Sequence, residues 1–266
     1  MGKLKAHIGS PGQKLDENFM NQYYARFPDI PPNSSFFGGW LKTRSALVHQ
    51  KWTDQTNAIF SISRLTSYYV YEDNVVIIPA GALLPVFFPA DGNAVLNYAK
   101  LGNDLAHKIM KAFDRTGILY DENGQVNPWN TTATVQRYIF NMRCLHHSHE
   151  KAGYSPLDLP LNETVASENV ADLAAATTAH AAYQMLHTSE RSNTLPGLNI
   201  TAEELYFIGR CTDACKYKNY TDTPAGHLSR PSSRCEVPAM NMEAFAQTYG
   251  CSVQARMNPS PKCSVW

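Results

Sequence analysis

Apolar residues recur at intervals of three and four along residues 95 to 114. They are Tyr98, Leu101, Leu105, Ile109, Ala112 and Phe113. This spacing predicts an amphipathic helix with one buried stripe. His107 and Lys111 lie four positions apart and therefore share one face of that helix. Glu168 and Asp172 have the same spacing in a second, alanine-rich stretch that also predicts a helix.

Apolar residues are spaced as in helices over several other parts of the chain. In one region they are spaced and composed as in β-strands. The expected helices cover residues 36–54, 131–145, 168–187, 201–216 and 242–249. Residues 57 to 74 are rich in β-branched and aromatic residues, and a turn signal at Glu72-Asp73-Asn74 precedes a second apolar run from Val75 to Ile78. The sequence therefore predicts a mainly α fold with a small β element (α+β).

The first part of the chain is more mixed than the rest. Residues 7 to 14 contain two glycines and a proline, which predicts a loop. Residues 28 to 35 contain three prolines and read as a linker. We therefore expect a helical lead-in and linker at residues 1–60, followed by a single lobe at residues 61–266.

Composition and charge exclude some classes of partner. The chain has 266 residues, 44% of them hydrophobic, and its 23 basic and 23 acidic residues give a formal net charge of +0. This balance favours neither nucleic acid nor an anionic membrane as a partner. The longest uncharged apolar run, Val75 to Ala90, contains three prolines and predicts no membrane span.

Cysteines and glycosylation sequons indicate an oxidising compartment. The six cysteines are Cys144, Cys211, Cys215, Cys235, Cys251 and Cys263, and the five N-x-[ST] sequons begin at Asn33, Asn130, Asn162, Asn199 and Asn219. Together they predict an extracellular or secretory glycoprotein with disulfides. The first residues lack the apolar stretch of a signal peptide, which contradicts export unless the chain is a fragment or its true N-terminus is missing.

The residues around His107 resemble a zinc motif with changed chemistry. Zinc hydrolases of the zincin type carry H-E-x-x-H on a helix, with two imidazole ligands and a catalytic glutamate. Here the five residues read His107-Lys108-Ile109-Met110-Lys111. A facing helix with Glu168 and Asp172 would complete the outline of such a site.

Several blocks, in order from about residue 60 to the last residue, resemble the C-terminal catalytic lobe of the neprilysin family of zinc metallopeptidases. The blocks are Ile78-Pro79-Ala80-Gly81 with Leu84-Pro85-Val86-Phe87-Phe88, Leu96-Asn97-Tyr98, Ser167-Glu168-Asn169-Val170-Ala171-Asp172, Leu195-Pro196-Gly197-Leu198, and Met257-Asn258-Pro259 with Lys262-Cys263-Ser264-Val265-Trp266. The resemblance implies a zincin, thermolysin-like fold for residues 61–266.

The resemblance also implies roles for single positions. His107 and Glu168 match zinc ligands, and Asp172 matches the carboxylate that orients a ligating imidazole. Lys108 stands where the family has its catalytic glutamate, and Lys111 stands where it has the second histidine ligand. His227 and Arg234 resemble the pair that stabilises the oxyanion and holds the substrate. Thr66, Ser67 and Tyr69 match the family's substrate-binding strand, but the asparagine of that strand is absent here.

The two lysines change what this site is expected to do. A protonated lysine offers no lone pair to zinc and cannot accept a proton from water. We therefore expect a catalytically inactive homologue that is not an enzyme, holds no cofactor and binds peptides or proteins. In place of the metal we expect a lysine–carboxylate pair, formed by Lys111 or Lys108 with Glu168, while Asp172 contacts His107; alternatively, both lysines extend into solvent.

Two other functions remain open. An active zinc metalloendopeptidase is possible if a ligand comes from elsewhere, such as the cluster His146-His147-Ser148-His149, although such a cluster is more typical of a solvated helix end. Alternatively, the chain is a structural lobe that needs a second chain to cover an exposed interface. The expected partners are accordingly a peptide ligand or a second chain.

The resemblance implies one disulfide and leaves the others open. It pairs Cys144 with Cys263, and it matches Cys215 and Cys251 to cysteines that reach a second lobe in the family. Cys211 and Cys235 have no counterpart in the family. These four cysteines can form two bridges, remain free or bind another chain.

Overall fold

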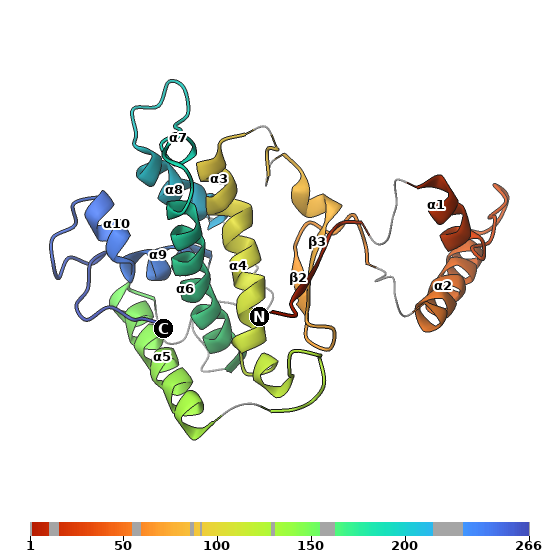
Figure 1. Cartoon of the computed structure of the whole chain (residues 1–266), viewed down its shortest axis with the longest axis horizontal. Helices are drawn as coiled ribbons and strands as arrows, with labels where there is room; N and C mark the ends of the chain where they lie inside the picture. Colours follow the sequence, from red (N-terminus) through yellow and green to blue (C-terminus); the bar gives the residue numbers. More distant parts are fainter. Residues whose placement is uncertain are drawn as a thin grey trace.

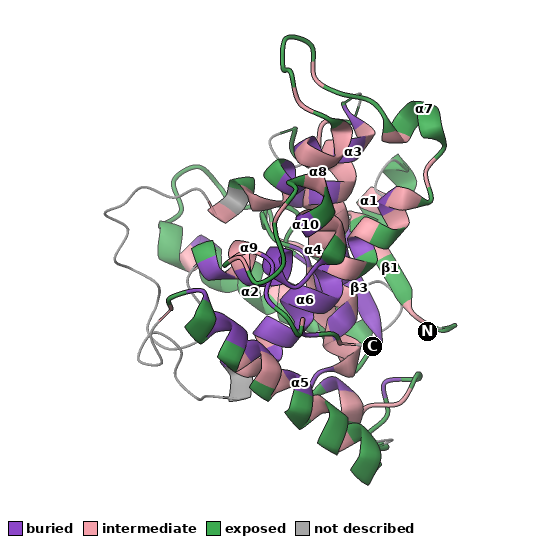
Figure 2. Ribbon diagram, turned by 90° about the vertical axis from the view of Figure 1, so that its left-hand side faces the viewer, coloured by how far each residue is buried: buried purple, intermediate pink, exposed green. Residues whose placement is uncertain are grey.

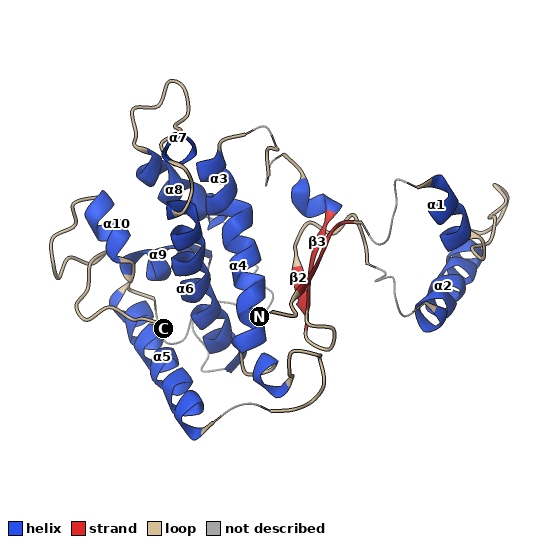
Figure 3. Cartoon of the chain, viewed as in Figure 1, coloured by secondary structure: helices blue, strands red, loops and turns tan. Residues whose placement is uncertain are grey.

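The computed structural model describes residues 2–10, 16–54, 60–85, 88–90, 92–128, 131–154, 163–214 and 231–265. Helices dominate these residues, as expected, and the strands form one small sheet (Figures 1 and 3). The strands are β1 (Lys5–Gly9), β2 (Tyr68–Val70) and β3 (Val75–Pro79), and the α-helices are α1 (Glu17–Tyr24), α2 (Phe36–Thr53), α3 (Ala94–Asn97), α4 (Asn103–Met110), α5 (Thr132–Lys151), α6 (Glu163–Gln184), α7 (Thr188–Arg191), α8 (Ala202–Cys211), α9 (Pro231–Met240) and α10 (Glu243–Thr248).

The sheet has the strand order β1-β3-β2, with β1 parallel and β2 antiparallel to β3. Its central strand β3 is buried on both faces. Val75 and Ile77 pack against Phe60, whereas Val76 and Ile78 belong to a cluster that includes Leu105 and Ile109 of α4. The sheet is therefore attached to α4 through the apolar stripe that the sequence pattern predicts.

Strand β1 corrects the expectation of a loop from His7 to Lys14. His7 pairs with Ile77 and Ile8 with Ile78, so the strand continues to Gly9. The pairing partner lies about seventy residues away in the chain, which explains why local composition did not reveal the strand.

Helices α4 and α6 lie side by side at the centre of the molecule (Figure 1). Ala106 of α4 meets Ala175 and Ala179 of α6 in one buried cluster. Small side chains at this contact allow the two helix backbones to approach closely. Figure 2 shows that most of α6 is buried, which agrees with its near-continuous run of small and apolar residues.

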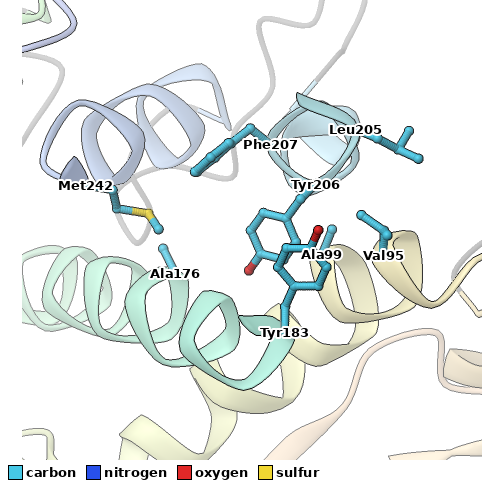
Figure 4. Packing of buried hydrophobic residues seen from close by; sticks show 8 residues of the cluster. All are labelled: Val95, Ala99, Ala176, Tyr183, Leu205, Tyr206, Phe207 and Met242. Carbon is cyan, nitrogen blue, oxygen red and sulfur yellow. The ribbon is translucent and has the colours of Figure 1, made fainter. Parts of the chain in front are cut away.

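An aromatic cluster closes the far end of this helix pair (Figure 4). The rings of Tyr183 on α6 and Tyr206 on α8 stack with centroids 4.9 Å apart. On another side of α8, Gly209 lies close to the segment that precedes α4: a Cβ atom there would lie 2.7 Å from Leu96 Cδ2 and 3.3 Å from the Ala99 Cβ. The cluster holds α8 against the segment that precedes α4.

Helix α9 was not expected from the sequence, since residues around it are rich in serine and proline. Pro231 stands at the first helical position, where its missing N–H costs nothing. Pro238 lies inside the helix, and Val237 and Met240 are nevertheless fully buried. Tertiary packing of these apolar residues therefore outweighs the low helix propensity of the segment.

Two disulfides are present among the described residues. Cys144 is bonded to Cys263, as the family resemblance implied, and joins α5 to the C-terminal segment. Cys211 is bonded to Cys235, which joins α8 to α9. Cys251 is free, and Cys215 lies outside the described residues.

Helices α1 and α2 lie apart from the other helices, at one end of the molecule (Figure 1). Several large apolar side chains of α2 are exposed, among them Phe36, Phe37, Trp40 and Trp52. No helix of the described part of the chain is long and apolar enough to cross a membrane.

Candidate functional site

Helices α4 and α6 bring one imidazole and two carboxylates together. His107 lies in the last turn of α4 with 4% of its surface exposed, and Glu168 and Asp172 lie one turn apart on α6. His107 Nε2 is 3.2 Å from Glu168 Oε2 and 3.3 Å from Asp172 Oδ1. Two carboxylate oxygens beside the same ring nitrogen favour a proton on Nε2.

Lys111 completes a pair with Glu168. It begins the 3₁₀ turn Lys111–Phe113 after α4, and its Nζ atom donates a hydrogen bond to Glu168 Oε1. The same ammonium lies 3.7 Å from Asp114 Oδ2. The lysine–carboxylate pair expected from the sequence is thus present, and so is the contact between Asp172 and His107.

Lys108 has a different environment. Its Nζ atom lies 3.4 Å from Asp104 Oδ1, one turn earlier on α4, and 3.5 Å from His107 Nδ1. The structure therefore selects Lys111, and not Lys108, as the partner of Glu168. The alternative in which both lysines extend into solvent is wrong, because the side chain of Lys111 is only 15% exposed.

Arg234 on α9 holds the second carboxylate. Its Nε and NH2 atoms each lie 2.7 Å from an oxygen of Asp172, in a two-pronged contact. Its NH2 atom is also 3.3 Å from His107 Nε2. The role toward substrate that the family resemblance implied for Arg234 stays a prediction; in this structure its guanidinium neutralises a carboxylate that faces α4. His227, its expected companion, lies outside the described residues.

Arg210 on α8 fixes the backbone that carries Arg234. It donates hydrogen bonds to the carbonyls of Arg234, at 3.3 Å, and Cys235, at 3.1 Å. The Cys211–Cys235 disulfide ties the same two helices together. Arg210 was not among the residues expected to contribute to the site, although a lone arginine beside the aromatic residues of this helix was a signal for a buried charge.

The charges around these carboxylates shift their ionisation. Burial by itself raises the pKa of Glu168, but the hydrogen bond with His107 and the charge of Lys111 outweigh it and lower the pKa to about 2. Burial likewise opposes ionisation of Asp172, yet Arg234 and His107 hold its pKa well below the usual range. Burial lowers the pKa of His107, but its hydrogen bonds with Asp172 and Glu168 outweigh this and raise it. The arrangement is a buried network of alternating charges.

The residues present do not fit a zinc ion. A zincin site needs three ligands with free lone pairs. Here His107 Nε2 faces two carboxylates, its Nδ1 faces the Lys108 ammonium, and Lys111 occupies the remaining position with a positive charge. Among the residues that the structure describes, no group of three or more His, Cys, Asp or Glu side chains is arranged to hold a metal.

The histidine cluster on α5 is not a fully solvated helix end. His147 is exposed and lies 3.4 Å from Glu150, whereas His149 is 1% exposed. The Nδ1 atom of His149 is buried and has no hydrogen-bond partner among the described residues, and its ring meets the edge of Tyr154. Burial and the nearby His146 lower the pKa of His149 to about 4, with Asp172 opposing them.

His149 is expected to make the protein sensitive to acid. Because its pKa falls from 6.5 to about 4 on folding, its contribution to stability is complete above pH 6.5 and is lost as pH falls toward 4. Between pH 6.5 and pH 4, the free energy of unfolding should fall by about 3 kcal/mol less in His149→Phe than in the unchanged chain. Urea unfolding at several pH values measures the difference. His147→Gln is the matched control and should retain the pH dependence; equal pH profiles for His149→Phe and the unchanged chain would contradict the prediction.

The expected substrate strand lies beside α4. Ser67 is buried and donates a hydrogen bond to Asp104, while the hydroxyl of Tyr69 donates to Asn74 Oδ1 at 2.9 Å. Thr66 is exposed and only accepts a 3.4 Å contact from Arg64 Nε. Strand β2 pairs with β3 on one side and, among the described residues, forms an edge of the sheet.

Comparison with known proteins identifies the family. The family model described as Peptidase family M13 matches residues 66–265. Neprilysin-2 of Caenorhabditis elegans is 27% identical over 284 residues, which cover 100% of this chain but 38% of that relative. The chain thus spans less than half of the length of this curated relative.

Solved structures show the same fold. The zinc metalloprotease Zmp1 of Mycobacterium tuberculosis, in complex with an inhibitor, superposes with a TM-score of 0.74 at 20% identity and covers 99% of this chain and 41% of its own. A galactose-containing glycoprotein complex of Haemonchus gives a TM-score of 0.79 at 19% identity and covers 100% of this chain and 45% of its own. The zincin-type lobe expected from the sequence is confirmed by these similarities.

The family assignment corrects one expectation. The two lysines led us to expect a chain that is not an enzyme, but the matched family is one of peptidases, and no comparison shows a loss of activity. The two lysines occupy two positions of one motif, whereas the family match extends over residues 66–265. With the match over residues 66–265, the chain belongs to Peptidase family M13.

Proposed function

We propose that this chain is a peptide-binding member of the M13 family in which Lys111, in place of a metal ion, supplies the positive charge beside Glu168. The contact between Lys111 Nζ and Glu168 Oε1 is the observation that carries the proposal. A buried carboxylate needs a compensating charge. Lys111 provides it for Glu168, and Arg234 provides it for Asp172.

Peptide binding is assigned to the edge of the sheet beside α4. An extended peptide can add a strand to an exposed sheet edge through main-chain hydrogen bonds. Strand β2 offers such an edge, and Ser67, which precedes it, is anchored to Asp104 of α4. Thr66 and Tyr69 would then lie next to the bound segment, as the family resemblance implies.

The setting proposed for this function is the secretory pathway. Two disulfides among the described residues and five sequons in the sequence support an oxidising compartment and glycosylation. A second chain is a further proposed partner, since the fold also occurs in a Haemonchus glycoprotein complex. The division into a lead-in at residues 1–60 and a lobe at residues 61–266 stays a prediction.

Peptide-bond hydrolysis is a second candidate function, and membership of a peptidase family favours it. It would need a metal held by ligands other than the set expected from the family, because Lys111 and Lys108 bring ammonium groups to two positions of the motif.

A fluorescent extended peptide and the same peptide with N-methylated backbone amides test the first function. The unmodified peptide should bind with at least about tenfold higher affinity in fluorescence anisotropy, because N-methylation removes the donors that pair with a strand edge. The protein should contain no stoichiometric zinc after purification in zinc-containing buffer. Equal binding of both peptides would refute the site at β2, and stoichiometric zinc with chelator-sensitive cleavage would establish hydrolysis instead.

A further inference from the structure

Helix α2 carries an exposed apolar face over its first two turns. Phe36 is 87% exposed, Phe37 is 66% exposed, and Trp40 and Leu41 are each 48% exposed. The rings of Phe37 and Trp40 stack with their centroids 6.1 Å apart. With roughly 200 Å² for each aromatic side chain, the three rings alone expose about 400 Å² of apolar surface. Patches of this size on a soluble protein are commonly covered by a partner.

Another side of α2 already has a partner. Gly39 is buried there, and a Cβ atom at this position would lie 3.0 Å from Ile30 Cγ2. The segment between α1 and α2 therefore packs closely on the side of Gly39. This contact fixes which side of α2 stays exposed, because residues 36, 37, 40 and 41 lie on the other sides of the same two turns.

A glycosylation sequon lies directly before the exposed face. It reads Asn33-Ser34-Ser35 and ends at the N-cap of α2. Asn33 is exposed in a turn that the hydrogen bond from the Ser34 amide to the Pro31 carbonyl closes at 2.9 Å. Ser35 Oγ accepts a hydrogen bond from the Gly38 amide at 3.1 Å, which leaves its hydroxyl proton to donate. The acceptor amide and the sequon hydroxyl are thus both on the surface.

The sequon and the aromatic rings are close enough for one glycan to contact both. A helix rises about 1.5 Å per residue, so Trp40 lies only about 8 Å along the axis from the N-cap Ser35. The first two sugars of a glycan span such a distance. One face of N-acetylglucosamine consists of C–H groups, which carry a partial positive charge and pack well on the negative face of an aromatic ring.

We propose that an N-linked glycan on Asn33 covers the apolar face formed by Phe36, Phe37 and Trp40. In the transfer step Asn33 Nδ2 attacks C1 of the first N-acetylglucosamine of a lipid diphosphate-linked oligosaccharide. The bond between C1 and the diphosphate oxygen breaks, the amide loses one proton and the lipid diphosphate leaves. The inference rests on the secretory setting proposed above, but not on peptide binding at β2.

A second sequon provides a control. Asn199 is also exposed on a loop, but the next residue, Ile200, packs against the aromatic cluster of α6 and α8. The hydroxyl of its sequon belongs to Thr201, the N-cap of α8. The other three sequons begin outside the described residues. A glycan on Asn199 would add the same bulk and solubility without touching α2.

The full chain, directed into the endoplasmic reticulum of cultured cells by a cleavable leader, tests the modification. Mass spectrometry of its glycopeptides should find a glycan on Asn33 in most molecules. A glycan on Asn199 but not on Asn33 would overturn the proposal and leave glycosylation of the chain in place. No glycan at either site would overturn both. Because occupancy is measured without a peptide ligand, the binding test at β2 remains a separate result.

Sedimentation over a range of concentrations tests the covering of α2. Asn33→Gln should self-associate at a concentration at least about tenfold lower than the glycosylated chain, a shift equivalent to about 1.4 kcal/mol. Asn199→Gln also loses a glycan and should cause no shift. Phe37→Ser with Trp40→Ser should restore the monomer in the Asn33→Gln background, because these changes remove the apolar face.

Two results would refute the covering of α2. One is an equal shift for Asn33→Gln and Asn199→Gln. The other is a chain that is glycosylated on Asn33 and still dimerises, with Phe37→Ser and Trp40→Ser abolishing the dimer, because a second copy would then cover α2. Circular dichroism checks that each variant is folded. If the triple variant does not fold, the two asparagine variants decide.

Discussion

A chain that carries Lys108→Glu together with Lys111→His is expected to bind about one zinc ion per molecule. The double change produces H-E-x-x-H at residues 107–111, with His107, position 111 and Glu168 as three ligands. It also removes the ammonium that now contacts Glu168 and the one that lies 3.5 Å from His107 Nδ1. Zinc content after dialysis, measured by elemental analysis, and competition with a zinc-binding dye test the result.

Single variants separate the contributions of the two lysines. Lys111→His alone should acquire measurable zinc affinity, because it supplies the third ligand, whereas Lys108→Glu alone should not. A chain with Lys108→Glu and Lys42→His controls for the addition of an imidazole at a surface position on α2. A folded double variant that binds no zinc would show that the network around Glu168 and His107 is not arranged like a metal site.

The second large effect concerns the stability of the buried network. Lys111→Met is expected to lower the free energy of unfolding by about 4 kcal/mol, because removal of one member of a buried ion pair leaves the other charge uncompensated. The side chains of Lys111 and Glu168 are only 15% and 14% exposed. Arg234, at 3.7 Å from Glu168, offsets part of the loss. Urea unfolding at pH 7 measures the difference.

A second change and a surface control give this prediction its test. Glu168→Gln in the Lys111→Met background should recover much of the stability, because it removes the unpaired charge. Lys3→Met breaks an ion pair with Glu122 whose side chains are 56% and 57% exposed, and it should cost less than about 1 kcal/mol. Similar losses for Lys111→Met and Lys3→Met would mean that Lys111 does not stabilise Glu168 in solution.

The same pair has a defined dependence on pH. The pKa of Glu168 is lowered from 4.5 to about 2, so the stability that its ionised form contributes is present above pH 4.5 and is lost as pH falls toward 2. This window lies below the one expected for His149. As pH falls, the free energy of unfolding should therefore decrease first through protonation of His149 and then, at lower pH, through protonation of the carboxylates of α6.

Local sequence spacing was sufficient for the faces of the two central helices. Residues four apart share a helix face whatever surrounds them, so His107 with Lys111, and Glu168 with Asp172, were correctly placed on common faces. The apolar stripe of α4 faces the sheet, and Ala106 of α4 packs against Ala175 and Ala179 of α6. The resemblance supplied the pairing of Cys144 with Cys263, which spacing alone left open.

Long-range contacts decided what local spacing could not. Either lysine could have reached Glu168 on sequence grounds, but only Lys111 lies on the side of α4 that faces α6, while Lys108 meets Asp104 on its own helix. Arg234 reaches Asp172 across 62 positions of the chain, from a helix that the sequence did not predict. His149 is buried as well, and Asp172 of α6 opposes the effect of that burial on its pKa.

By itself, the sequence determined the helical faces, the family and the identity of the charges available to the site, because these depend on residue type and short-range periodicity. Only the tertiary structure decided which charges meet and that β1 joins the sheet. Those features depend on distances between residues far apart in the chain, and packing of the whole lobe sets these distances.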